Sequence, residues 1–201
     1  MHTEKKTKIL DRIDSYSAHA KKDIRMADIV PSIENEDFKS IVRNMFVVLM
    51  YSYIEGTIKN IANIYIDFIR TARHGNLNAH FSFLIHDENK PLKILKSLTN
   101  RKYDNIIDTE DNLKFCVLLK ILFILNVPSQ KYFKFKTQLD KLVENRNALA
   151  HGDLKIYNDD IKITDEYISS VKDMTSQLID MFCDDIRDCI DKDAHFLNTK
   201  I

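Results

Sequence analysis

The chain has 201 residues, and its thirty basic side chains balance thirty acidic ones, so the formal net charge is zero. That balance excludes a long-range positive field for holding nucleic acid, and any contact with RNA must come from a local basic patch. Glycine and proline number only three each, too few for the turns of a sandwich, a barrel or an α/β fold. The composition therefore predicts an all-α protein, a helical bundle.

The cysteines and the apolar runs indicate the cellular compartment of the protein. Cys116, Cys183 and Cys189 are odd in number and lack the spacing of a metal site, which favours free thiols in a reducing cytoplasm. The first residues contain no apolar signal core, and the longest apolar runs stop well short of the ~20 residues that span a bilayer. We therefore expect a cytoplasmic protein that makes no contact with a membrane.

Two helices are predicted in the first third of the chain. Apolar residues recur every three or four positions from about residue 4 to 29, which predicts a helix that ends near Pro31. A longer helical pattern runs from 36 to about 73 and is apolar on nearly all sides in its middle, so we place it at the centre of the bundle. Gly56 within it suggests that another backbone packs closely against this helix.

The middle of the chain has weaker patterns. Residues 74–110 are predicted to form an insertion of short helices and connectors within one domain that spans residues 1–201. Residues 112–125 are so uniformly apolar that a buried helix is favoured but a strand remains the alternative. No repeat or low-complexity linker divides the chain.

The last third is predicted to contain two helices. The first is capped by Ser129 and ends at Gly152, and the second runs from 165 to about 196. Between them, residues 154–164 alternate in polarity around a polar turn and predict a small β-hairpin.

A cation is predicted in the apolar face of the helix that ends at Gly152. On a helix that advances about 100° per residue, Arg146 lies in the middle of that face, between Leu142 and Leu149. A permanent charge there is costly unless it is paired or opens onto an interface. The other members of the predicted face are Phe135, Leu139, Val143 and Ala150.

Two polar side chains accompany the arginine. Asn147 and His151 are four residues apart, so both point to one flank of the helix beside Arg146. A guanidinium, an amide and an imidazole at one helix end suit cleavage of RNA by its own 2′-hydroxyl. The histidine can accept or deliver a proton near neutral pH, and the arginine offers a planar fork to the phosphate oxygens. Arg146, Asn147 and His151 are therefore the candidate catalytic set, and their chemistry needs no metal or other cofactor.

Three further side chains are given supporting roles. Lys134 and Lys141 make the same region basic and are predicted to guide the RNA backbone, although most such runs are simply a solvated face. Glu55, on the long helix, either steadies Arg146 or pairs with Lys59 one turn away. From the residues alone, a structural ion pair of Arg146 with a carboxylate such as Glu55 is the preferred interpretation.

The motif resembles that of a known family. The segment RNALAH, residues 146–151, resembles the Arg-x4-6-His motif of the HEPN superfamily (higher eukaryotes and prokaryotes nucleotide-binding), including its polar residue directly after the arginine. LMYSYIEGTIKNIANIYIDFI resembles the long second helix of stand-alone HEPN proteins from toxin–antitoxin and phage-defence loci, and the HGD that ends the motif helix fits as well. Together these likenesses cover roughly residues 36–73 and 130–195.

The resemblance implies a fold, an activity and partners. The fold would be a helical bundle that forms a homodimer and brings two Arg/His motifs together across the interface. The activity would be that of a metal-independent endoribonuclease acting as a toxin or defence effector, often held in check by a cognate antitoxin protein. Two alternatives remain open: a non-catalytic HEPN module that binds nucleotide, RNA or a partner protein, and a purely structural helical scaffold.

Overall fold

The computed structural model describes residues 2–71, 112–152 and 163–194. Throughout these ranges the secondary structure is helical and no strand occurs, so the predicted all-α fold is confirmed. The predicted insertion at 74–110 and nearly all of the predicted hairpin at 154–164 lie outside the described residues. The elements are α1 (His2–Ile24), the 3-10 helix η1 (Arg25–Ser32), α2 (Glu36–Thr71), α5 (Phe115–Ile124), the 3-10 helix η2 (Gln130–Phe135), α6 (Lys136–His151) and α7 (Asp165–Asp191).

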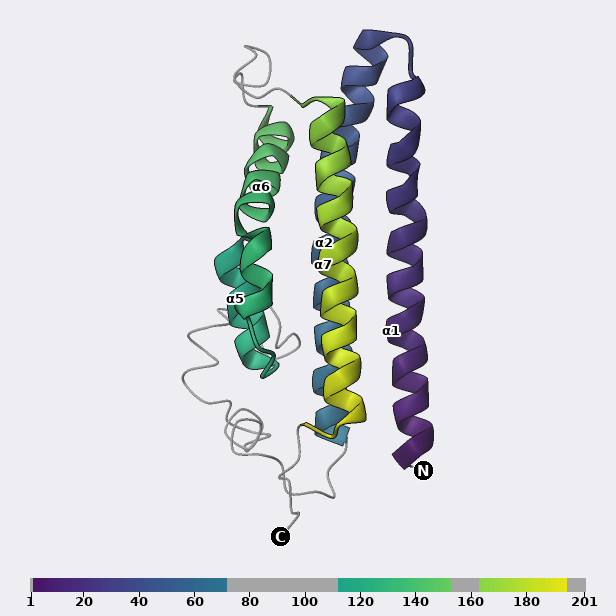
Figure 1. Ribbon diagram of the computed structural model, residues 1–201, viewed down its shortest axis with the longest axis vertical. Helices are drawn as coiled ribbons and strands as arrows, with labels where there is room; N and C mark the ends of the chain where they lie inside the picture. The colour runs from purple at the N-terminus through teal and green to yellow at the C-terminus, as the bar shows by residue number, and fades with distance from the viewer. Residues whose placement is uncertain (1, 72–111, 153–162, 195–201) are drawn as a thin grey trace.

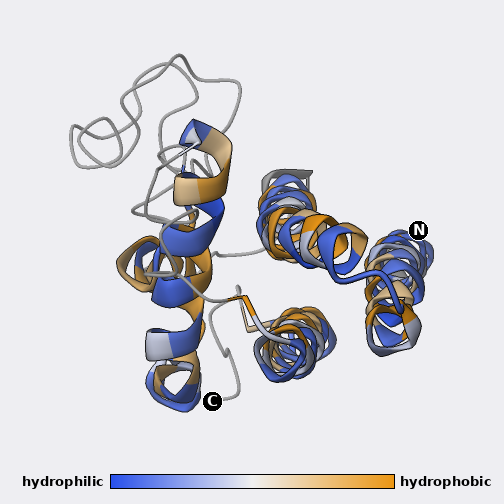
Figure 2. Ribbon diagram, turned by 90° about the horizontal axis from the view of Figure 1, so that it is seen from above, coloured by the Kyte–Doolittle hydropathy of each residue, from blue (hydrophilic) through white to orange (hydrophobic). Residues whose placement is uncertain are grey.

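The long helices lie side by side as a bundle (Figure 1). α2 and α7 occupy the middle, with α1 on one side and α5 and α6 on the other (Figures 1 and 2). α2 packs against α1, α6 and α7, so the central position predicted for it is confirmed. Its 36 residues span about 54 Å, which makes it the scaffold along which the other helices are placed.

Polar residues begin the two central helices. The side chain of Asn35 accepts a 2.8 Å hydrogen bond from the backbone N–H of Phe38 at the start of α2. Thr164 is the N-cap of α7, and its hydroxyl accepts a 3.2 Å hydrogen bond from the N–H of Tyr167. Acidic residues follow each cap, in the first turn, where the positive end of the helix dipole stabilises them. Both helices therefore start within one residue of the predicted positions.

The predicted end of the first helix is wrong. α1 stops at Ile24, and the chain tightens into the 3-10 helix η1, which contains Pro31. Ala27 and Val30 in η1 are buried in the core and hold this tighter turn against the bundle. Pro31 therefore lies near the end of a 3-10 helix instead of terminating a continuous α-helix.

Three other local predictions are settled by the structure. Residues 115–124 form the helix α5, so the strand alternative is excluded. Ser129 makes no capping hydrogen bond, because the residues that follow it form η2 and the α-helical part starts only at Lys136. Gly56 has no close backbone neighbour: a Cβ built there would meet nothing within 4 Å. That glycine lies on a face of α2 that no other described helix covers.

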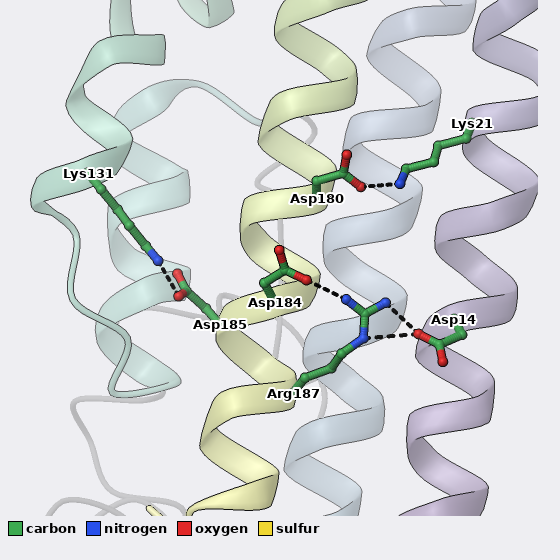
Figure 3. A network of polar contacts seen from close by, with 7 residues as sticks. All are labelled: Asp14, Lys21, Lys131, Asp180, Asp184, Asp185 and Arg187. Carbon is green, nitrogen blue, oxygen red and sulfur yellow. Dashed lines mark hydrogen bonds and ion pairs between the residues drawn. The ribbon is translucent and has the colours of Figure 1, made fainter.

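Ion pairs join α7 to its neighbours around the apolar core (Figure 3). Arg187 of α7 pairs with Asp14 of α1 and with Asp184 one turn earlier on α7. Nζ of Lys21 on α1 lies 2.5 Å from Oδ1 of Asp180 on α7. These charges lie at the surface, so the apolar core beneath them contributes most of the stability. No helix in the described ranges has an apolar stretch of the length and hydropathy that a membrane crossing needs.

Candidate functional site

The motif helix α6 is anchored by apolar side chains and ends abruptly. Leu139, Leu142 and Val143 are fully buried. Gly152 follows the last residue of α6 in the left-handed conformation, with φ of 62°, and its N–H bonds back to the carbonyl oxygens of Ala148 and Leu149. Because glycine adopts this conformation without a Cβ clash, the predicted end of the helix at Gly152 is confirmed.

Arg146 is half-buried and its guanidinium has two defined contacts. Its central carbon lies 4.7 Å from the centroid of the Tyr51 ring on α2, and one terminal nitrogen donates a 2.9 Å hydrogen bond to Oδ1 of Asn147. No carboxylate among the described residues forms a salt bridge with it. A guanidinium has five N–H donors, so the described residues leave most of its hydrogen-bonding capacity unused.

Tyr51 connects the arginine to the rest of the site. The ring is 1 % exposed, and the hydroxyl accepts a 2.9 Å hydrogen bond from the backbone N–H of Leu113. Burial raises the pKa of Tyr51 to about 12, and the negative charge of the Glu55 carboxylate acts in the same direction. Glu55 is half-buried and, within the described part of the chain, forms a salt bridge with neither Arg146 nor Lys59.

The structure brings Arg146 and Asn147 together but leaves His151 apart. Asn147 is half-buried beside the arginine, whereas His151 is exposed as the last residue of α6. Five residues along a helix turn through about 140° beyond one full turn, so Arg146 and His151 point to different flanks of α6. In the described ranges, the His151 ring makes no hydrogen bond or ion pair that would orient it.

The two predicted RNA-binding lysines lie in different surroundings. The Lys134 ammonium is 4.7 Å from the ring centroid of Phe135 and 3.5 Å from Oε1 of Gln177. It borders an open pocket of about 560 Å³ between η2 and α7, which Glu166 and Asp173 also line. This pocket lies at the opposite end of α6 from His151, so Lys134 is poorly placed to serve the motif.

Lys141 lies nearer to the motif. Its ammonium is 5.3 Å from the ring centroid of Tyr167 on α7, and it is exposed on α6 less than two turns before Arg146. A cation over an aromatic ring keeps its charge available to an approaching phosphate. Of the two lysines, Lys141 therefore has the better position to contact the RNA backbone.

Sequence reasoning missed one buried polar residue of the motif. Asn145 is only 5 % exposed, and its side chain faces Tyr167 of α7. Burial raises the pKa of Tyr167 to about 12, and the amide of Asn145 opposes that shift. The signal was its spacing: Asn145 follows Leu142 by three residues and precedes Leu149 by four, which places it on the same face as both leucines. Asn145 therefore lies where the motif helix meets α7.

Metal-ligating side chains are not gathered at the motif. Where the structure describes the chain, no three side chains of the His, Cys, Asp or Glu type come close enough to hold a metal ion. The exposed and half-buried polar groups of the motif are the guanidinium of Arg146, the amide of Asn147 and the imidazole of His151. All of them suit an anionic ligand that is bound through hydrogen bonds.

The comparisons with known proteins identify the family. Residues 7–190 match the family model described as RiboL-PSP-HEPN. The chain therefore belongs to this HEPN family, which confirms the resemblance to the HEPN superfamily. A search of curated proteins and a search of solved structures found no match.

Proposed function

We propose that this protein is a metal-independent endoribonuclease that cleaves RNA by attack of the 2′-hydroxyl on the adjacent phosphate. The observation that carries the proposal is the state of Arg146. In a HEPN chain, its guanidinium is held at the surface of α6 by Tyr51 and Asn147, and no described carboxylate neutralises it. A cation held in this way can bind a phosphate and stabilise the charge that builds on its oxygens during the reaction.

In the proposed reaction, histidine side chains accept and donate the protons. The 2′-oxygen forms a bond to phosphorus while His151 takes the hydroxyl proton, and the bond from phosphorus to the 5′-oxygen breaks. The departing 5′-oxygen takes a proton from a second imidazole. The products are a 2′,3′-cyclic phosphate and a 5′-hydroxyl. DNA lacks the attacking hydroxyl and should resist cleavage.

The separation of Arg146 and His151 on α6 supports a homodimer with the active site at its interface. Because one copy presents the two groups on different flanks, a second copy would supply the imidazole or the guanidinium that one phosphate needs. Five large apolar side chains are exposed along the first half of α2 at spacings of three and four residues, which is the pattern of a helix face that packs on a partner. They are Phe38, Ile41, Met45, Val48 and Leu49.

Purified protein incubated with RNA in EDTA tests the activity. We expect cleavage that persists in EDTA, leaves 2′,3′-cyclic phosphate ends and is lost in Arg146→Ala and His151→Ala. His19→Ala is the matched control, because His19 is exposed on α1, away from the motif. Cleavage that requires a divalent ion, or that survives His151→Ala, would overturn the mechanism.

The biological role is proposed as that of a toxin or defence effector restrained by a cognate antitoxin protein. Expression of the wild-type protein should then arrest growth of a bacterial host, whereas His151→Ala should not. Co-expression of the product of the neighbouring gene should relieve the arrest. Equal growth of the two strains would contradict the proposed toxin role and leave the nuclease assay as a separate question.

One observation favours a second candidate, a non-catalytic HEPN module that binds RNA or nucleotide. The ring of His151 has no partner among the described side chains to orient it, whereas Arg146 is already ordered for anion binding. This candidate predicts that RNA binds and is recovered intact. Retention of binding in His151→Ala, together with its loss in Arg146→Ala and the absence of turnover in the wild type, would favour it.

A further inference from the structure

We propose that Tyr51 is a positioning residue for the guanidinium of Arg146: its ring supports the guanidinium, and its hydroxyl fixes the ring. This inference rests on the proposed function. It assigns a role to a residue of α2 that lies outside the Arg-x4-His motif.

The ring is the first part of the device. The guanidinium carbon lies 4.7 Å from the ring centroid, and the ring is 1 % exposed. The arginine therefore rests on a ring that is fixed by the surrounding core. A planar cation over an aromatic face is held in place while its N–H groups remain in its own plane. The Asn147 amide, at 2.9 Å from a terminal nitrogen, then sets the rotation of that plane.

The hydroxyl is the second part. It accepts the backbone N–H of Leu113 at 2.9 Å, so the tyrosine is tied to the segment that precedes α5. The ring under Arg146 is therefore held both by its burial and by this hydrogen bond.

Removal of the hydroxyl and removal of the ring should have different effects. Tyr51→Phe keeps the buried surface under Arg146, so the chemical step should be little changed. Tyr51→Leu removes the supporting face, so the guanidinium is misplaced and the chemical step should slow.

Cleavage kinetics measure this difference. Tyr51→Leu should lower kcat on the order of 100-fold, whereas Tyr51→Phe should largely retain kcat. Tyr65→Leu is the matched control: it removes an equally buried tyrosine ring from the same helix, fourteen residues beyond Tyr51. A loss of kcat in Tyr65→Leu as large as that in Tyr51→Leu would mean that the ring acts only through stability.

An NMR measurement separates this inference from the proposed function. The Nε–Hε resonance of Arg146, assigned by its absence in Arg146→Lys, should be shifted upfield by the ring current of Tyr51. Tyr51→Phe should retain the shift. If wild-type protein neither binds nor cleaves RNA, the proposed function fails, and this resonance still decides whether the tyrosine positions the arginine. An unshifted resonance in wild-type protein overturns the positioning role.

Discussion

Nε of Arg43 on α2 donates a 2.6 Å hydrogen bond to Oδ1 of Asp165, the first residue of α7. The other carboxylate oxygen of Asp165 accepts from Lys39 at 2.9 Å, and Lys39 is only 8 % exposed. These contacts join the starts of α2 and α7 at the end of the bundle where α6 ends (Figure 1). The hydrogen bonds from Arg43 and Lys39 lower the pKa of Asp165 below its ordinary value.

The stability that Asp165 contributes should therefore depend on pH. Because folding lowers its pKa from 3.8, this contribution is present above pH 3.8 and is lost as the pH falls through the folded-state pKa. At pH 7, Asp165→Asn should lower the free energy of unfolding by about 1.5–3 kcal/mol, since Lys39 and Arg43 then keep only their longer contacts with Glu36.

Urea unfolding at pH 7, 5 and 3 checks this prediction. The difference between wild type and Asp165→Asn should shrink between pH 5 and pH 3. Asp173→Asn, at an exposed position on the same helix, is the control and should change little at any pH. A difference between wild type and Asp165→Asn that is as large at pH 3 as at pH 7 would contradict the assignment.

The two described glycines should respond to alanine with opposite signs. Gly152 has φ of 62°, so Gly152→Ala forces a Cβ into the left-handed region and should cost about 1 kcal/mol, or roughly 2–4 °C in Tm. Gly152→Asn should cost less, because asparagine tolerates that conformation better. Thermal unfolding followed by circular dichroism measures both variants, and a Gly152→Ala protein as stable as wild type would refute the strain argument.

Gly56→Ala should stabilise the folded chain. Gly56 lies within α2, and an added Cβ meets nothing within 4 Å, so the substitution gains helix propensity without a clash. The expected gain is about 0.5–1 kcal/mol in the free energy of unfolding. The same thermal assay tests it, and a lower Tm for this variant would indicate that something packs against this face of α2 in solution.

A charge in the exposed apolar face of α2 should disrupt the proposed homodimer. Met45 is 57 % exposed in the middle of that face, so Met45→Lys leaves the single chain folded but places a charge in the proposed interface. Light scattering at micromolar concentration should give a dimer for wild type and a monomer for Met45→Lys, with loss of RNA cleavage.

Met26→Lys is the control for that experiment. Met26 is 61 % exposed on η1, outside the apolar face of α2, so this variant should remain a dimer. Either a wild-type monomer or a dimeric Met45→Lys protein would exclude this face as the interface of a shared active site.

Much of the fold could be predicted because the spacing of apolar residues along the sequence indicates which face of each helix is buried. The ends of α2, the start of α7 and the end of α6 at Gly152 follow from spacing, from acidic first turns and from a glycine cap. The start of α6 could not be predicted, because 3-10 and α-helical turns have nearly the same spacing over the six residues of η2.

The sequence predicted which residues belong to the candidate site, but it did not predict which side chains they contact. Arg146 was placed in the apolar face from its spacing, and its half-buried position agrees with that placement. Its neighbour was not predictable, because the side chain that meets it, Tyr51, is ninety-five residues earlier and looks like any buried aromatic residue. The spacing of residues along a helix predicts the direction in which a side chain points from that helix. It does not predict which other helix the side chain contacts.

The two flanks of the bundle should respond differently to ionic strength. Surface ion pairs border α1, and at molar salt the screening length falls to about 3 Å, so these pairs weaken. The arginine of the motif instead rests on a buried ring, a contact that added salt affects far less. A salt concentration that dissociates RNA from the protein should therefore leave the contact between Arg146 and Tyr51 intact. In hydrogen-exchange measurements at that salt concentration, the amides of α1 should lose protection first.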